Sequence, residues 1–239
     1  MNIKAAMAEL FGTFMLVLIG AGAGAQADVG LVGVAFAHGL ALVVIIYVFG
    51  SISGAHVNPA VTFGVALAGR MDWPKAVNYW IAQLLGALAA AYLLQWILGH
   101  GTNLGATIGS LTPRGGEEVV PGASALKVIV VEGVLTAFLV IAVFASGIHG
   151  RNGNMAGMAI GLVLTMDILM GGPLTGGSMN PARTLGPAVA NGDVSYVWMY
   201  FVGPLLGGAV GALLYDKYFL PQAELTPPVE AAESRGKRR

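Results

Sequence analysis

Long apolar stretches separated by short polar connections run along almost the whole chain. A helix needs about 20 mainly apolar residues to cross the hydrocarbon core of a membrane. Six stretches meet or approach that length. They cover residues 5–25, 31–50, 79–98, 126–147, 155–170 and 194–215. The first is too long for a signal peptide and no polar cleavage region follows it, so we expect it to remain as a membrane span.

Two shorter apolar runs, 57–68 and 179–190, lie between the second and third spans and between the fifth and sixth. Each is too short to cross a membrane. Asn58-Pro59-Ala60 stands at the start of one run and Asn180-Pro181-Ala182 at the start of the other. Asparagine is a favoured helix N-cap, and proline fits the first helical turn. Each triplet therefore predicts a half-helix that enters the membrane without crossing it.

The chain also repeats itself at a spacing of about 120 residues. Each half holds three full spans, an odd number, so the second half enters the membrane from the opposite side. In such an inverted repeat the two half-helices meet near the midplane, with the positive ends of their dipoles pointing toward one place. Three pairs carry the spacing: Glu9 with Glu132 (123 residues), Asn58 with Asn180 (122), and Gln83 with Pro204 (121).

Composition and charge narrow the function classes. Hydrophobic residues make up 56% and charged residues 10% of the chain, against roughly 45–50% and 25% in ordinary soluble proteins. The 12 basic and 12 acidic residues give a net charge of zero, so the chain lacks the positive charge typical of a protein that binds nucleic acid. The absence of cysteine excludes disulfides and thiolate metal sites. The sequence therefore predicts an integral all-α membrane protein.

The basic residues predict its orientation. With the N-terminus in the cytoplasm, nine Lys and Arg residues fall on the inner side and only Arg114 and Lys127 on the outer side. This satisfies the positive-inside rule and places both termini in the cytoplasm. The proline-containing segment at 218–239, with its basic end, is expected to be a disordered cytoplasmic tail.

Taken together, these motifs resemble the aquaporin, or major intrinsic protein, family over about residues 5–215. The resemblance implies six transmembrane helices plus two half-helices in an inverted repeat, and a homotetramer with one pore per subunit. It implies a passive, proton-excluding water channel, with no enzymatic activity and no cofactor. The channel domain is expected over 1–217, with repeats at 5–98 and 126–216 joined by a loop at 99–125. The residues that carry the resemblance are both Asn-Pro-Ala triplets, Ser53-Gly54-Ala55-His56, Arg183, Glu9 and Glu132.

The resemblance also implies roles for the residues around the half-helices. Asn58 and Asn180 donate N–H groups to passing solute, and Glu9 and Glu132 hold the loops, with proton relay as the alternative. Non-helical backbone at this depth is tolerated where it faces a water-filled cavity. The residues expected to line the pore are Gly54, Ala55, His56, Val57, Gly176, Ser178 and Met179.

The resemblance further implies a selectivity filter of four residues, which counting from the two motifs places at His38, Ile168, Gly177 and Arg183. This set is similar to that of some plant tonoplast intrinsic proteins, which are associated with water and ammonia. A charge such as Arg183 inside a membrane is functional by default, with a structural ion pair as the alternative. One hypothesis is that His38 and Arg183 bind and deprotonate ammonium; the other is that His38 only fills volume and hydrogen-bonds a loop. The loop at 99–122 is a candidate to contribute a fifth residue to the selectivity filter.

Several alternatives remain beside the water channel. A glycerol or other small neutral solute facilitator is opposed by Thr184, Ala188 and the Tyr200-Phe201 pair, where glycerol facilitators differ. A secondary transporter also shows inverted repeats, and Asp167 is its one unpaired acidic candidate, which we interpret as a loop-facing hydrogen-bond acceptor. A third alternative to the water channel is a membrane junction protein whose pore is closed. No metal-ligand spacing appears, and the expected site is the cell membrane or the vacuolar membrane.

Overall fold

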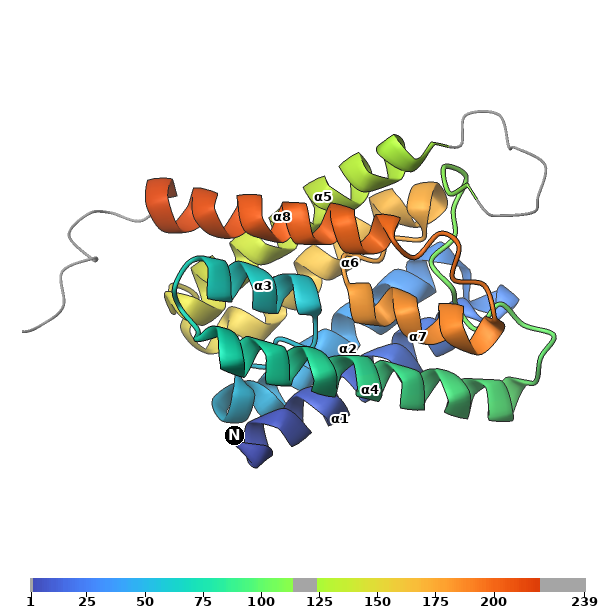
Figure 1. Ribbon diagram of the computed structural model, residues 1–239, viewed down its shortest axis with the longest axis horizontal. Helices are drawn as coiled ribbons and strands as arrows, with labels where there is room; N and C mark the ends of the chain where they lie inside the picture. Colours follow the sequence, from blue (N-terminus) through green and yellow to red (C-terminus); the bar gives the residue numbers. More distant parts are fainter. Residues whose placement is uncertain (1, 114–123, 220–239) are drawn as a thin grey trace, which may run out of the picture.

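The computed structural model describes residues 2–113 and 124–219, and every regular element in these ranges is helical (Figure 1). The predicted pattern of six membrane-length helices and two short helices is present in the described residues. Part of the central loop and the tail from residue 220 onward lie outside the described residues. The six long helices are α1 (Ile3–Gly24), α2 (Gly30–Ser53), α4 (Trp73–Leu98), α5 (Ala125–Ala142), α6 (Ala156–Thr175) and α8 (Met199–Leu214). The two short helices are α3 (Pro59–Leu67) and α7 (Pro181–Asn191).

Some helix ends differ from those that the apolar runs predict. Helix α4 begins at Trp73, six residues early, because Pro74 lies in its first turn, where a missing N–H costs nothing. Helix α8 begins late, at Met199, after a segment of turns that is itself apolar. Helix α6 continues to Thr175 and stops where Gly176 adopts a left-handed φ of 87° and donates its N–H to Gly172. Gly176 therefore acts as the C-cap that glycine commonly supplies.

Packing follows the inverted repeat. Helices α1 and α4 pack together in the first half, and their equivalents α5 and α8 pack together in the second. Half-helix α3 contacts α8, and half-helix α7 contacts α4, so each half-helix lies against the last span of the other half. Helices α2 and α6 also contact each other. These crossed contacts hold the two half-helices in the interior of one bundle (Figure 1).

Small residues allow the closest of these helix contacts. A Cβ atom placed on Gly207 of α8 would lie 2.0 Å from the carbonyl oxygen of Gly133 on α5. Gly203 and Gly211, one turn to either side, are similarly close to α5 backbone. The glycine stripe of α8 therefore packs within the subunit, where small residues let two membrane helices approach closely.

Substitution of Gly207 by alanine is expected to destabilise the bundle, because the added methyl can only be accommodated if α5 and α8 move apart. Overpacking of this kind costs typically about 1–3 kcal/mol. Thermal unfolding in detergent should show a lower Tm for Gly207→Ala. Gly101→Ala is the matched control, since a Cβ there meets nothing within 4 Å. Equal Tm values for the two variants would contradict the close contact.

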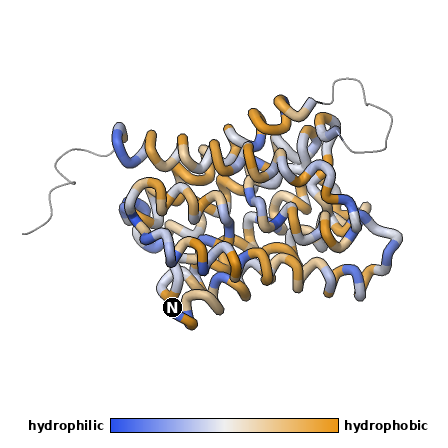
Figure 2. Tube along the Cα trace, viewed as in Figure 1, coloured by the Kyte–Doolittle hydropathy of each residue, from blue (hydrophilic) through white to orange (hydrophobic). Residues whose placement is uncertain are grey.

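The outer surface is apolar along the spans. Large exposed side chains such as Phe11, Leu40, Ile81 and Leu206 face outward from four different helices. Figure 2 shows hydrophobic residues along the helices and hydrophilic ones gathered mainly toward their ends. Within residues 2–113 and 124–219, six helices are long and apolar enough to cross a membrane. This distribution suits a protein whose surroundings are lipid.

Candidate functional site

The two Asn-Pro-Ala triplets meet in the interior of the bundle. The side-chain oxygen of Asn58 accepts a hydrogen bond from the N–H of Ala60 (2.9 Å), and that of Asn180 accepts one from Ala182 (3.0 Å). Each asparagine therefore caps its half-helix, as predicted. Each also reaches across to the other half: Asn58 Nδ2 donates to Met179 O (2.8 Å), and Asn180 Nδ2 donates to Val57 O (2.9 Å). A side-chain amide has two N–H groups, so one on each asparagine remains for a solute.

The residues before the two asparagines have an unusual backbone. Val57 has a φ of 43° and Met179 a φ of 52°. Non-glycine residues rarely adopt this left-handed region, and a β-branched residue such as valine least of all. Such strain costs of order 1–3 kcal/mol and persists only where the surroundings impose it. This geometry turns each carbonyl toward the asparagine of the opposite half.

Two buried glutamates hold these strained loops. Glu9 accepts hydrogen bonds from His56 N (2.9 Å) and Val57 N (2.7 Å). Glu132 accepts from Ser178 N (3.0 Å) and Met179 N (2.7 Å) at the equivalent places. Each glutamate also accepts from a hydroxyl at the end of the helix before its loop, Ser53 or Thr175, at 2.6 Å. Both carboxylates act as acceptors for the loops, which matches the loop-support interpretation rather than proton relay.

Sequence reasoning did not identify several other members of this network. The hydroxyls of Tyr79 and Tyr200 donate to the carbonyls of Ser53 and Thr175, the residues that close α2 and α6. Gln83 Nε2 donates to Glu9 Oε2 at 2.7 Å. Tyr79 and Tyr200 stand 121 residues apart. The repeat spacing therefore contained this information, and extending the comparison of the two halves to all polar positions would have found it.

Arg183 lies just inside α7 and is 3% exposed. Its Nη1 donates to the carbonyl of Gly105 (2.6 Å), and its Nε donates to His38 Nε2 (3.2 Å). No carboxylate within the described ranges lies at salt-bridge distance from it. The structural ion pair considered as an alternative is therefore absent from this part of the chain.

Both ring nitrogens of His38 form hydrogen bonds. Because arginine only donates, His38 Nε2 must accept from it, and the proton on Nδ1 then faces the carbonyl of Val34 at 2.9 Å. The imidazole is therefore held as one neutral tautomer. This geometry argues against the hypothesis in which His38 acts as a base, but the partners of His38 lie on α2 and α7 and not on a loop, as the other hypothesis expected.

Ile168 and Gly177 lie against each other. Ile168 is 1% exposed, and a Cβ placed on Gly177 would be 3.3 Å from the Cα of Ile168. Gly177 has a φ of 57°, which glycine adopts without strain. The four residues predicted for the filter thus form two couples, one polar and hydrogen-bonded, the other apolar.

The loop between the halves reaches this region through Gly105. This residue has a φ of 66°, and a Cβ on it would lie 2.1 Å from the carbonyl oxygen of Ala21. Only glycine fits there, and its carbonyl holds Arg183. Thr107 fixes the same loop through its hydroxyl, 2.8 Å from that of Thr184. Gly176, expected in the pore wall, instead lies against the backbone of Thr107 and Ile108.

A narrow lumen runs past the asparagines. Its volume is about 20 Å³, and a cavity needs roughly 10–15 Å³ on this measure to hold one water. A wider cavity of about 350 Å³ shares the lining residues His56, Val143 and Ile160 with it. This cavity lies toward the end of the bundle where α1 begins and α8 ends, called here the inner end. His56 borders both cavities, with its Nδ1 3.0 Å from Thr62 Oγ1. The polar residues around the lumen are His38, His56, Asn58, Ser178, Asn180 and Arg183.

Asp167 is 1% exposed on α6, and its Oδ2 has no hydrogen-bond partner in the described part of the chain. The interpretation of Asp167 as a loop-facing acceptor stays a prediction. No group of three or more potential metal-binding side chains occurs among the described residues.

Comparison with known proteins gives consistent matches over the whole bundle. The family model for major intrinsic proteins matches residues 1–215. Aquaporin TIP2-1 of Arabidopsis thaliana is 40% identical, covering 96% of this chain and 93% of that protein. Probable aquaporin TIP2-2 of Oryza sativa subsp. japonica is 42% identical, covering 92% and 88%. The aquaglyceroporin of Plasmodium falciparum is a similar solved structure, with a TM-score of 0.79, 25% identity, and coverage of 95% and 100%.

Proposed function

Since the chain belongs to the major intrinsic protein family and is a transmembrane water channel, we propose that its pore also conducts ammonia and excludes ions. The family and the resemblance to the tonoplast intrinsic type, both predicted from the motifs, are confirmed by relatives that carry aquaporin TIP2 names. The chain is a channel and not an enzyme.

The observation that carries the ammonia proposal is the division of the filter into two couples. On the polar side, His38 and Arg183 satisfy each other and leave Arg183 N–H groups for a solute that accepts hydrogen bonds. On the apolar side, Ile168 and Gly177 have no polar side-chain atom, so this side supplies no side-chain hydrogen bond. Water stripped of partners on one side pays a desolvation penalty. Ammonia has one heavy atom, as water does, but only one lone pair. Donors on one polar wall can therefore satisfy its whole capacity to accept hydrogen bonds, which they cannot do for water.

Size argues against the glycerol alternative. A lumen of about 20 Å³ holds one molecule the size of water or ammonia, whereas glycerol has six heavy atoms. The aquaglyceroporin of Plasmodium falciparum shares the fold at 25% identity, well below the 40% of Aquaporin TIP2-1. Water and ammonia are therefore the solutes that the pore geometry supports.

Ion exclusion follows from charge near the lumen. The N-termini of α3 and α7 point toward the same place and carry positive partial charge, and Arg183 adds a full charge beside the filter. A cation or proton meets this positive field, as is general for aquaporin-type pores. We assign the loop-support role to Glu9 and Glu132 and the filter role to the His38, Ile168, Gly177 and Arg183 set within this proposal.

The proposal includes an orientation and an assembly. Both termini face the cytoplasm, so the wider cavity at the inner end is the cytoplasmic mouth. The chain forms a homotetramer with one pore in each subunit, in the cell membrane or the vacuolar membrane. The nine inner Lys and Arg residues against two outer ones support the orientation.

Replacing Ile168 with histidine is expected to reduce ammonia permeability at least fivefold and to leave water permeability within about twofold. The new ring restores a hydrogen-bonding group on the apolar side of the filter and occupies the space beside Gly177. The measurement is ammonia uptake into proteoliposomes, read with an internal pH dye after rapid mixing, with osmotic shrinkage of the same vesicles as reference.

Ile168→Val is the matched control, since it keeps the wall apolar, and it should conduct ammonia like the unmodified protein. Ammonia uptake no faster than in empty vesicles, with water flux intact, would overturn the ammonia proposal and leave the water channel standing.

A further inference from the structure

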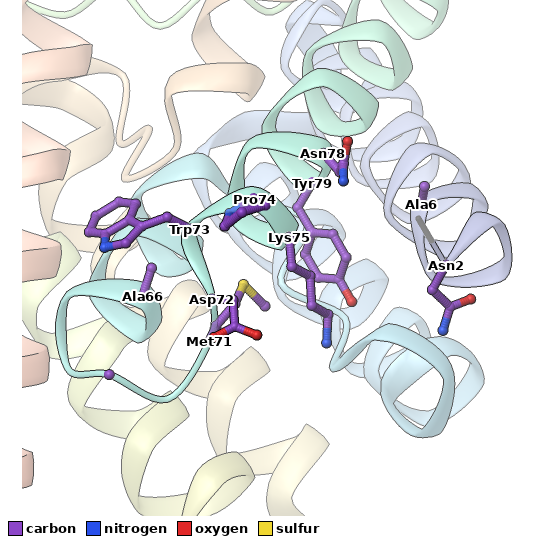
Figure 3. A pocket seen from close by; sticks show the side chains of 11 residues that line it. Asn2, Ala6, Ala66, Met71, Asp72, Trp73, Pro74, Lys75, Asn78 and Tyr79 are labelled. Atoms are coloured by element: carbon purple, nitrogen blue, oxygen red, sulfur yellow. The ribbon is translucent and has the colours of Figure 1, made fainter.

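A second, larger recess lies at the inner end, apart from the pore. It has a volume of about 830 Å³ and is bounded by the start of α1, the end of α3 and the start of α4. Figure 3 shows Lys75 and Tyr79 of α4 between Asn2 on one side and Trp73 on the other. We refer to it as the α1–α4 cleft. None of the residues that line it borders the lumen or the wider cavity of the pore.

The α1–α4 cleft lies beside the first turns of two membrane-spanning helices, where the boundary between lipid and water is expected. Trp73 is 45% exposed at its edge, and tryptophan and tyrosine favour the boundary between lipid and water. From this level, outward-facing apolar residues continue along both bounding helices toward the middle of the span. They are Ile3, Met7 and Phe11 on α1, and Val77, Ile81 and Leu85 on α4. A recess lined by both polar and apolar side chains thus lies beside two helices that carry exposed apolar side chains.

Lys75 supplies an available cation in this recess. Its Nζ lies 5.4 Å from the centre of the Tyr79 ring, and it forms no ion pair with any described carboxylate. Arg70, on the loop beside the cleft, is already engaged, because its Nη2 lies 2.9 Å from Asp216 Oδ1. The ammonium of Lys75 is therefore free to bind an anion.

Backbone donors add to this cation. Asp72 precedes α4 as its N-cap residue, but its side chain makes no capping hydrogen bond. The first N–H groups of a helix have no partner within the helix, so those of Trp73 and Lys75 have no side-chain cap. Helix α1 differs, because Asn2 accepts from Ala5 N. The carboxylate of Asp72 also borders the cleft and supplies one negative charge.

We infer that the α1–α4 cleft binds the headgroup of a membrane phospholipid. The phosphate lies at Lys75 and the first turn of α4, and the acyl chains lie along the apolar faces of α1 and α4. Because Asp72 brings a carboxylate to the same recess, the headgroup is one that also carries an ammonium, as in phosphatidylethanolamine. This site is independent of which solutes the pore conducts.

Native mass spectrometry of the full chain in detergent, with phosphatidylethanolamine added, tests the inference. We expect the unmodified protein to retain one lipid per chain, and Lys75→Met to retain at least fivefold less. Lys217→Met is the matched control, because Lys217 is exposed at the same inner end but does not border the cleft. It should retain the lipid fully. Equal retention by all three proteins would overturn the inference.

A competition distinguishes a lipid from a soluble phosphate. Glycerophosphoethanolamine carries the same headgroup without acyl chains and should not displace the lipid at tenfold excess. Displacement by this probe would show a site for soluble phosphodiesters and overturn the lipid assignment. Water permeability of Lys75→Met should equal that of the unmodified protein, which shows that the variant is folded.

Discussion

Replacing Glu9 with leucine is expected to abolish water permeability and to reduce the yield of folded protein. The carboxylate accepts four hydrogen bonds of 2.6–2.9 Å, from Ser53 Oγ, His56 N, Val57 N and Gln83 Nε2. A buried donor left without its partner costs about 1–3 kcal/mol. Four such donors together approach the whole net stability of a typical domain, about 5–15 kcal/mol. The strained backbone at Val57 loses its support at the same time.

Glu9→Gln is the informative companion variant. The amide keeps the length of the side chain and one acceptor oxygen, but turns an NH₂ group toward donors. We expect a partial loss of folded protein and of flux, between Glu9→Leu and the unmodified chain. Size-exclusion chromatography and osmotic shrinkage of proteoliposomes measure the two effects. Normal flux through Glu9→Leu would show that the loop does not depend on this carboxylate.

Replacing Arg183 with alanine is expected to admit small cations such as methylammonium, at a rate about 10²-fold above the unmodified protein. A unit charge about 5 Å from a passing cation contributes roughly 3 kcal/mol of repulsion at an effective dielectric constant near 20. That energy corresponds to about a hundredfold in rate. Water carries no net charge, so its permeability should change by less than about threefold.

His38→Phe is the control for this experiment. It removes one partner of Arg183 but leaves the hydrogen bond to the carbonyl of Gly105, so cation exclusion should persist. Uptake of labelled methylammonium under a membrane potential measures both variants. Arg183→Ala vesicles as tight to methylammonium as unmodified ones would show that the half-helix ends alone exclude cations. The same His38→Phe vesicles should still conduct ammonia, since His38 has no free ring nitrogen to serve as a base.

The architecture could be predicted from the sequence because both halves of the chain contain the same pattern of spans, Asn-Pro-Ala motif and glutamate. Proline and asparagine at the start of two short apolar runs predict half-helices from local chemistry alone. The matched positions of Glu9 and Glu132 pointed to the two carboxylates that accept hydrogen bonds from both loops. Where the sequence signal for a half-helix or a glutamate was weak in one half, the equivalent positions of the other half supported the same prediction.

Other features had no local pattern to reveal them. The left-handed backbone at Val57 runs against the preference of a β-branched residue and exists because tertiary hydrogen bonds impose it. Gly105 is one glycine among 36, and only the fold brings its carbonyl to Arg183. The missing partner of Asp167 likewise depends on which side chains α5 and α6 bring together. The late start of α8 was missed because most residues directly before it, Val194 and 196–198, are also apolar or aromatic.

Osmotic water flux into and out of reconstituted vesicles, measured by stopped-flow light scattering, tests the central claim most directly. A pre-formed lumen with room for about one water molecule predicts permeability many-fold above empty vesicles, with a weak dependence on temperature. An imposed proton gradient should persist in the same vesicles as long as it does without protein. Water flux equal to that of empty vesicles, or a proton gradient that collapses with the protein present, would contradict the account of a water-conducting, ion-excluding pore.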